Sequence, residues 1–250
     1  MPISQTTLTH LAHFDTPTVC NAVELYGIRP QDVGFMDSRI RACFPELNPM
    51  VGFAATASFR ASFKPQPDGG VYDNMIEQVR SFDGLAGPAV VVIQDLDDPP
   101  VGAVFGEVMC STYRAFGAVG LVTGGAGRDL EQVAALRFPV FTGSTICSHA
   151  YPQIVDVGKA VRIGGLVVRQ GDLLHGDANG VTGIPMEIAD ELPEVTAEFA
   201  AAERILLDYL QGPGEKTLAG VAEAHADSAT AVDRLRQRVQ KRGRSSFPGV

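Results

Sequence analysis

Short apolar runs alternate with amphipathic segments along the chain, and their spacing predicts a mixture of strands and helices. Residues 89–94, AVVVIQ, are short and rich in β-branched side chains, which is typical of a buried strand. Residues 51–63, VGFAATASFRASF, have the same strand character. A helix is predicted over 71–82, and another over 108–116, where apolar positions fall near helical spacing without Gly or Pro.

Turn and cap signals place the remaining elements. Thr16 and Pro17 suit the N-cap and first position of a helix that Gly27 ends. An Asn-Gly turn at 179–180 predicts a hairpin within 171–185. Further strands are expected at 121–123, 138–141, 153–157 and 160–168, and further helices at 130–136, 186–210 and 217–242.

This order of elements indicates the fold class. Strands alternate with helices through the middle of the chain and cluster at 138–185, which predicts an α/β fold with a mixed central sheet. The 250 residues are enough for one large domain with a sizeable core. We therefore expect a single layered domain over 1–212 and a helical, basic C-terminal extension over 213–250.

Charge is distributed unevenly and bears on possible partners. The net charge is −9, but residues 234–250 contain six of the 20 Lys and Arg residues and no acid, so the rest of the chain carries −15. An acidic body does not suit a nucleic-acid binder. The basic tail is either a solvated helix end or a contact for RNA or an acidic neighbouring subunit.

Nothing in the sequence suggests a membrane or an oxidising compartment. No apolar run approaches the ~20 residues that span a bilayer, and the N-terminus lacks a signal-peptide pattern. The four cysteines have neither CxxC nor zinc-finger spacing, so we expect them to be reduced and mostly buried. Cys110 could act as a nucleophile, but no base is recognisable beside it. A cytoplasmic location is the expectation.

The stretch 102–129 holds the strongest candidate chemistry. After an apolar run, Gly106 and Glu107 form a turn into a predicted helix. The first N–H groups of a helix have no intrahelical acceptor, and the helix dipole adds partial positive charge there. The N–H groups of Glu107, Val108 and Met109 are therefore expected to bind a small carboxylate.

The same stretch ends in a glycine-rich loop at 124–127 that delivers Arg128 and Asp129. Arginine presents a planar fork that suits a carboxylate or an enolate oxygen. Aspartate is a hard oxygen ligand suited to Mg²⁺ or Mn²⁺. The alternative is an ordinary surface ion pair between sequence neighbours.

Other polar groups are open to two interpretations. His149 lies between predicted elements, where it either transfers a proton or is a hydrogen-bonded structural residue. His175, close to Asp177, is expected to be a satisfied turn residue. The acidic run 95–98 either binds a cation or is a solvated loop.

Taken in order, the glycines and charged residues of the chain resemble the RraA-like family. That family includes 4-hydroxy-4-methyl-2-oxoglutarate aldolase, a divalent-metal pyruvate aldolase, and the ribonuclease E inhibitor that gave the family its name. Each motif alone is weak, but the full set in order is specific. The matching positions are Gly106-Glu107, Gly117, Gly120, Gly125, Arg128-Asp129, the segment 16–22, Gly52, Ala54, Thr56, 138–141, Gly165, Val168, Gly171-Asp172, Gly176-Asp177, Gly180-Val181 and Pro185.

The resemblance implies a layered α/β/β/α fold and roles for the central residues. Asp129 would be the main protein ligand of Mg²⁺ or Mn²⁺, with waters completing the shell. Arg128 would contact the pyruvate-derived part of the substrate. The helix N-terminus after Gly106, through Val108 and Met109, would receive the pyruvate carboxylate.

The resemblance also implies homotrimers or hexamers. An Asn in the region of Asn74 and a Glu from the neighbouring subunit's late helix, matched loosely by Glu203, would approach the site. The family often has Asp or Asn at Gly124 and Asp at Asn21, so the departures here bear on the substrate.

The sequence therefore predicts a metal-dependent carbon–carbon lyase, an aldolase or decarboxylase. It would cleave a 4-hydroxy-2-oxo acid or oxaloacetate to pyruvate through an enolate. Glu107 and the neighbouring subunit's Glu are the candidate bases. One alternative is a non-catalytic regulator that binds an RNA-processing enzyme, and another is a related lyase or hydrolase, suggested by His149 and Gly124.

Overall fold

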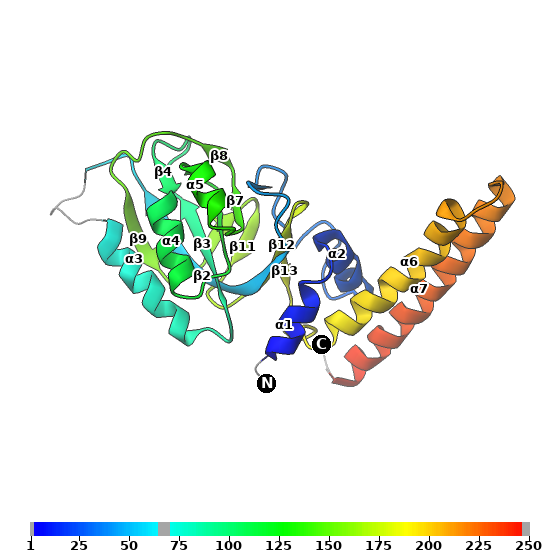
Figure 1. Cartoon of the computed structure of the whole chain (residues 1–250). Coiled ribbons are helices and arrows are strands. Elements are labelled where there is room, and N and C mark those ends of the chain that lie inside the picture. The colour runs from blue at the N-terminus through cyan, green and yellow to red at the C-terminus, as the bar shows by residue number, and fades with distance from the viewer. Residues whose placement is uncertain (1–2, 65–70, 247–250) are drawn as a thin grey trace.

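A mixed β-sheet forms the centre of the molecule (Figure 1). The computed structural model describes residues 3–64 and 71–246. Within this part of the chain the sheet has eight strands, in the order β1-β7-β5-β3-β2-β12-β13, with β9 also paired to β2. Their bounds are β1 Arg41–Ala42, β2 Met50–Arg60, β3 Ala89–Asp95, β5 Gly120–Thr123, β7 Val140–Thr142, β9 Gln153–Val157, β12 Leu173–Asp177 and β13 Gly180–Ile184.

The sheet is parallel at its centre and antiparallel at its sides. β2, β3, β5 and β7 run parallel to one another, as expected for strands separated by helices. β12 and β9 both pair antiparallel with β2, and β12 forms the predicted hairpin with β13. Its two loop residues are Ala178 and Asn179, one position before the predicted Asn-Gly pair, because Gly180 already pairs with Asp177. The prediction of an α/β fold with a mixed central sheet is confirmed.

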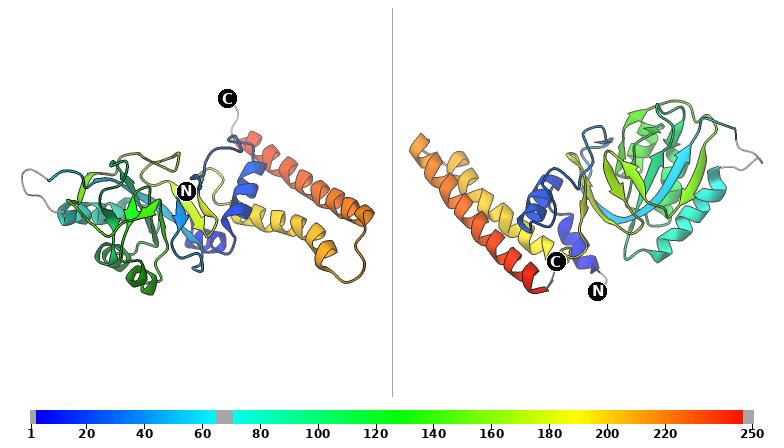
Figure 2. Two further views of the ribbon diagram at one scale, coloured as in Figure 1. Left: turned by 90° about the horizontal axis from the view of Figure 1, so that it is seen from above. Right: turned by 180° about the vertical axis from the view of Figure 1, so that it is seen from behind.

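The helices fall into two groups at opposite ends of the molecule (Figures 1 and 2). Helices α3, α4 and α5 cover one face of the sheet, whereas α6 and α7 form a long hairpin that projects away from it beyond α1 and α2. None of the described helices is both long and apolar enough to cross a membrane. The bounds are α1 Gln5–Leu11, α2 Thr16–Leu25, α3 Val71–Arg80, α4 Glu107–Ala115, α5 Leu130–Ala135, α6 Leu192–Gln211 and α7 Leu218–Ser246, with a 3-10 turn, η1, at Ser81–Gly84.

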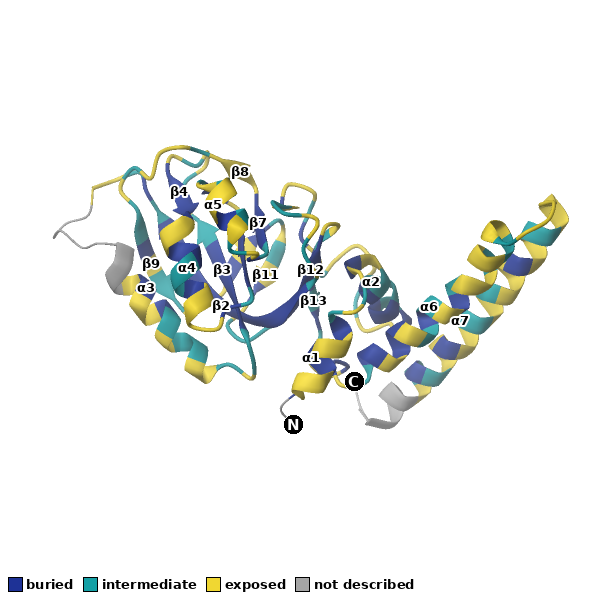
Figure 3. Ribbon diagram, in the orientation of Figure 1, coloured by how far each residue is buried: buried dark blue, intermediate teal, exposed yellow. Residues whose placement is uncertain are grey.

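Strand β2 contributes residues to three hydrophobic clusters, because successive side chains of a strand point to opposite faces. The strand is buried along almost its whole length (Figure 3). Ala55, Ala57 and Phe59 pack under α3 and α4. Phe53 packs with the N-terminal helices and α6, and Ala54 faces the opposite side of the sheet. Burial on both sides explains why β2 and β3 are almost continuously apolar.

A buried polar chain fixes α4 over the sheet. Tyr113 of α4 donates its hydroxyl to Gln78 Oε1 at 2.8 Å, and Gln78 Nε2 donates to the carbonyl of Ala55 at 3.1 Å. These buried groups are satisfied only when α3, α4 and β2 keep this arrangement. The C-terminal half of α4 is thereby anchored to α3 and β2.

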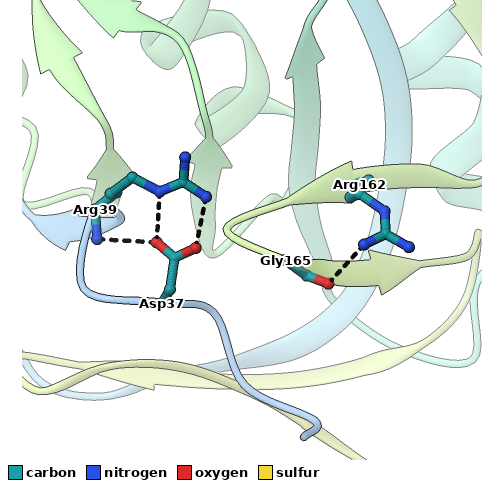
Figure 4. A network of polar contacts seen from close by, with 4 residues as sticks. All are labelled: Asp37, Arg39, Arg162 and Gly165. Atoms are coloured by element: carbon teal, nitrogen blue, oxygen red, sulfur yellow. Dashed lines mark hydrogen bonds and ion pairs between the residues drawn. The ribbon is translucent and has the colours of Figure 1, made fainter.

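The irregular segment between α2 and β2 is tied to a small hairpin on the other side of the sheet. The hairpin consists of β10 (Val161–Ile163) and β11 (Leu166–Val168). Arg162 donates to the carbonyl of Gly165 across its turn, and the Asp37 carboxylate bonds Arg39 nearby (Figure 4). The Asp37 N–H donates to the carbonyl of Gly164, which joins the two segments.

His175 is a buried strand residue, so its predicted place in a turn is wrong. It lies in β12 and bonds the Thr16 hydroxyl at 2.9 Å and the carbonyl of Leu11 at 3.1 Å. Asp177 accepts the Thr16 N–H, so this end of β12 holds α1 and α2. Burial lowers the pKa of His175 and so favours the neutral ring, which can donate from Nε2 to the Leu11 carbonyl and accept at Nδ1 from the Thr16 hydroxyl.

Several boundaries differ from the prediction for identifiable reasons. The helix expected from residue 186 begins at Leu192, because Pro193 occupies the first turn, where a missing N–H costs nothing. The short helix α1, capped by the Ser4 hydroxyl on the Thr7 N–H, was not expected from its polar sequence. Of the four cysteines only Cys110 is fully buried, which corrects the expectation that most are.

Candidate functional site

The N-terminus of α4 opens at the end of a short strand. Strand β4 (Ala103–Phe105) leads into Gly106, which is the N-cap of α4. The N–H of Cys110 is bonded to the carbonyl of Gly106, so the N–H groups of Val108 and Met109 precede the first intrahelical bond. These two N–H groups lie at the N-terminal end of α4, where the helix dipole is positive.

A second parallel strand brings Arg128 to this helix end. Strand β6 (Ala126–Gly127) pairs with β4, and β8 (Ser144–Thr145) pairs with β6. The Arg128 N–H donates to the carbonyl of Phe105 at 3.1 Å. Gly127 permits this approach, since a Cβ at this position would lie 2.0 Å from the Phe105 ring.

Asp129 caps α4 from a distance of 22 residues in sequence. Its Oδ2 accepts the Glu107 N–H at 3.1 Å, and a Cβ on Gly106 would meet the same oxygen at 2.5 Å. Asp129 has φ 56° and ψ 38°, a left-handed conformation that is uncommon outside glycine and clusters at functional sites. Glycine at position 106 and an unusual backbone at 129 together place the carboxylate on the helix end.

Arg128 and Asp129 also contact each other. Arg128 Nε lies 3.7 Å from Asp129 Oδ2, and the two side chains are 36% and 39% exposed. The pair is therefore in contact, as the surface ion-pair alternative requires. The pair differs from an ordinary surface ion pair in its location, because both residues line a pocket beside the N-terminus of α4.

These groups line a pocket of about 220 Å³. It brings together Gly106, Val108, Met109, Arg128 and Asp129, and it adds His149 from a segment that follows β8. Its other walls are Ala103, Phe105 and Pro152, which the sequence did not single out. Phe105 directly precedes Gly106, and Pro152 lies three residues after His149. Their closeness in sequence to predicted site residues was the signal that could have identified them.

Comparisons with known proteins identify the family of the chain that carries this site. The model of the RraA-like family, described as Aldolase/RraA, matches residues 16–182. The chain belongs to the RraA-like family. The match includes β2 to β12, and with them every residue of the pocket.

A relative and two solved structures agree with this assignment. A protein of Halalkalibacterium halodurans with the provisional name 4-hydroxy-4-methyl-2-oxoglutarate aldolase is 32% identical over 144 residues, 52% of this chain and 69% of its own. An uncharacterized protein of Pseudomonas syringae pv. tomato has a TM-score of 0.70 at 21% identity, covering 90% and 95% of the two chains. RraAS2 of Streptomyces coelicolor, described as an unusual member of the RNase ES inhibitor RraA family, has a TM-score of 0.64 at 19% identity, covering 81% and 96%. At these identities the structures show the shared RraA-like fold.

Three predicted residues are not among those that line the pocket. Asn74 donates its side-chain amide to the carbonyl of Ile154 and thereby holds α3 against β9. Glu203 lies on α6, in the helical hairpin at the opposite end of the molecule from α4 (Figure 1). Glu107 contributes its backbone N–H to Asp129, and its side chain is exposed outside the pocket lining.

The donor set of the pocket suits a hydrated cation more than a closed metal cage. Among the described residues no group of three or more His, Cys, Asp or Glu side chains could hold a metal ion. Among the described residues that line the pocket, Asp129 is the one carboxylate, and the Glu107 N–H bonds its Oδ2 and not its Oδ1. Mg²⁺ commonly keeps several waters and uses one or two carboxylates, so the residues present fit such an ion.

The remaining candidate groups lie outside the lining of this pocket. Burial raises the pKa of the Cys110 thiol to about 12, so this cysteine is not a ready nucleophile. Asp95 Oδ1 accepts the Asp97 N–H, and Asp97 accepts the Ala61 N–H, which shapes the acidic loop 95–98. A larger hollow of about 460 Å³ lies between α6 and α7, but its Glu198 and Arg238 are paired at 2.6 Å and no predicted site residue lines it.

Proposed function

We propose that this RraA-like protein is a carbon–carbon lyase that releases pyruvate from a 4-hydroxy-2-oxo acid or from oxaloacetate. The observation that carries the proposal is the convergence of Arg128, Asp129 and the N-terminus of α4 on one small pocket. An arginine fork and free helix N–H groups suit a 2-oxo carboxylate, and both suit the enolate formed when the adjacent carbon–carbon bond breaks.

Each group has a distinct task in this reaction. The N–H groups of Val108 and Met109 bind the substrate carboxylate at the positive end of α4. Arg128 donates to the 2-oxo oxygen, whose negative charge grows as the enolate forms. Asp129 would hold Mg²⁺ or Mn²⁺, which when bound acts as a Lewis acid on the 2-oxo group. Phe105 and Pro152 supply apolar walls beside these polar groups.

Metal dependence gives the direct test of this function. Purified protein with Mn²⁺ is expected to release pyruvate from oxaloacetate and from 4-hydroxy-4-methyl-2-oxoglutarate, and EDTA is expected to abolish the release. Pyruvate can be followed continuously with a coupled dehydrogenase, with heat-inactivated protein as the control for metal-catalysed decarboxylation in solution. Absence of turnover on both substrates with Mg²⁺ and Mn²⁺ would instead favour a regulatory RraA-like protein.

The active unit is proposed to be a homotrimer or a pair of trimers, with Glu203 completing a neighbour's site. Glu203 is half-buried on α6, and burial, with a smaller contribution from Asp15, raises its pKa. Because the α6–α7 hairpin projects away from the pocket, Glu203 can approach a site only in another subunit (Figure 2).

Mixed oligomers test the role of Glu203. Co-refolded Arg128→Ala and Glu203→Ala subunits are expected to recover part of the activity that each variant lacks alone, because some sites then combine two intact halves. Glu223→Ala, at an exposed position on α7, replaces Glu203→Ala in the matched control. A monomer in light scattering, or mixtures as inactive as the separate variants, would remove Glu203 from the site.

A further inference from the structure

The segment that carries His149 is joined to its neighbours by backbone hydrogen bonds on both sides. The Ala103 N–H donates to the carbonyl of Ser148 at 2.8 Å, and the Tyr151 N–H donates to the carbonyl of Ala61 at 3.2 Å. These bonds fix the backbone on both sides of His149. Ala103 belongs to β4, so the same strand positions this segment and the start of α4.

The residue after His149 has a strained backbone. Ala150 has φ 44°, a left-handed conformation that residues with a Cβ rarely adopt. Its N–H donates to Ser148 Oγ at 3.0 Å. Strain of this kind persists only where the surroundings impose it, and it is concentrated at functional sites. Here it turns the carbonyl of Ala150 toward the ring of His149, which it contacts.

That contact selects one tautomer of the His149 ring. Nδ1 lies 2.8 Å from the carbonyl oxygen of Ala150. A carbonyl only accepts hydrogen bonds, so Nδ1 carries the hydrogen in this bond. In the neutral ring Nε2 therefore has the free lone pair, which is the form that a general base needs.

The other titratable groups of the pocket are committed to other tasks. Among the described lining residues these groups are Arg128, Asp129 and His149. Arginine stays protonated and cannot accept a proton. Asp129 Oδ2 already accepts the Glu107 N–H and lies beside Arg128. Of the titratable side chains that this chain itself supplies to the pocket lining, His149 is left as the one that can take a proton from a bound substrate.

We propose that His149 Nε2 is the general base of the cleavage step, an assignment that rests on the proposed lyase function. Nε2 removes the proton from the 4-hydroxyl group of the substrate. The O–H electrons form the new C4 carbonyl, the C3–C4 bond breaks, and its electron pair enters the pyruvate enolate. The imidazolium then releases its proton to solvent, and C3 of the enolate takes a proton from water to give pyruvate.

Two substrates distinguish this role from simple binding. Oxaloacetate loses CO₂ to give the same enolate, but it has no 4-hydroxyl proton to remove. In His149→Gln, cleavage of 4-hydroxy-4-methyl-2-oxoglutarate is expected to fall by about 10²–10⁴-fold, the usual contribution of a general base. Decarboxylation of oxaloacetate by the same variant is expected to stay near the wild-type rate. The control is His225→Gln, an exposed position on α7, which should change neither rate.

Each other outcome overturns the assignment. Equal losses on both substrates, with an unchanged circular dichroism spectrum and Tm, would show that His149 binds substrate or shapes the pocket. Unchanged cleavage would show that another group is the base. Failure of the wild-type protein to turn over either substrate would instead refute the lyase function, and the base assignment with it.

Discussion

Arg128→Lys is expected to lower kcat for pyruvate formation by about 10²–10³-fold, the usual effect of losing one transition-state donor. Lysine keeps the positive charge but replaces a planar two-point fork with a single flexible ammonium group. The N–H of Arg128 donates to the carbonyl of Phe105 in β4, so the backbone position of residue 128 should be unchanged in the lysine variant. The loss would therefore come from the geometry of the donors.

Steady-state kinetics on both substrates would measure this effect, since oxaloacetate and the aldol substrate require the same enolate. Both values of kcat should fall together, in contrast to the split expected for His149→Gln. Arg114→Lys is the matched control, because Arg114 is exposed in the last turn of α4. A near-normal kcat in Arg128→Lys would mean that the arginine serves the structure of the loop only.

The fold could be predicted where local pattern and burial agree. β3 is apolar because both faces of the sheet are covered, and the hairpin of β12 and β13 was signalled by the Asn-Gly pair, although its loop residues are Ala178 and Asn179. The start of α6 could not be predicted by periodicity, because the turns at 186–191 continue the apolar spacing of the helix. Pro193 was the better signal, since proline favours the first turn of a helix over its interior.

The candidate site was predictable in its charged residues but not in its assembly. Glycines before Arg128 and after Phe105 indicated a close approach of the backbone. That the Asp129 carboxylate meets the N–H of Glu107 depends on the pairing of β4 with β6, two short strands without a strong sequence pattern. The tautomer of His149 depends on the backbone conformation of Ala150, for which alanine gives no local signal.

Asp129→Asn is expected to remove most metal-dependent turnover while the protein stays folded. Asparagine is nearly isosteric and lacks the negative charge that a divalent cation requires. Loss of an outer-sphere partner typically weakens metal binding or activity by roughly 10–100-fold, so loss of the direct ligand should exceed this range. Isothermal titration with Mn²⁺ and the pyruvate assay would measure the two effects separately.

The contact between Asp129 and α4 makes a second variant informative. In Asp129→Asn the side-chain amide oxygen can still accept the Glu107 N–H, so the cap of α4 is kept. Asp129→Ala loses both the cation ligand and the cap, and loss of a cap costs about 0.5–2 kcal/mol of unfolding free energy.

Thermal or urea unfolding should therefore distinguish the alanine variant from the asparagine variant, whereas both should have lost Mn²⁺ binding. Asp156→Asn, at an exposed pair with Lys159, is the control for removal of a surface charge. Full activity with undiminished Mn²⁺ binding in Asp129→Asn would leave Asp129 with its structural role alone. In that case the cap that it forms on α4 would be sufficient reason for its left-handed backbone.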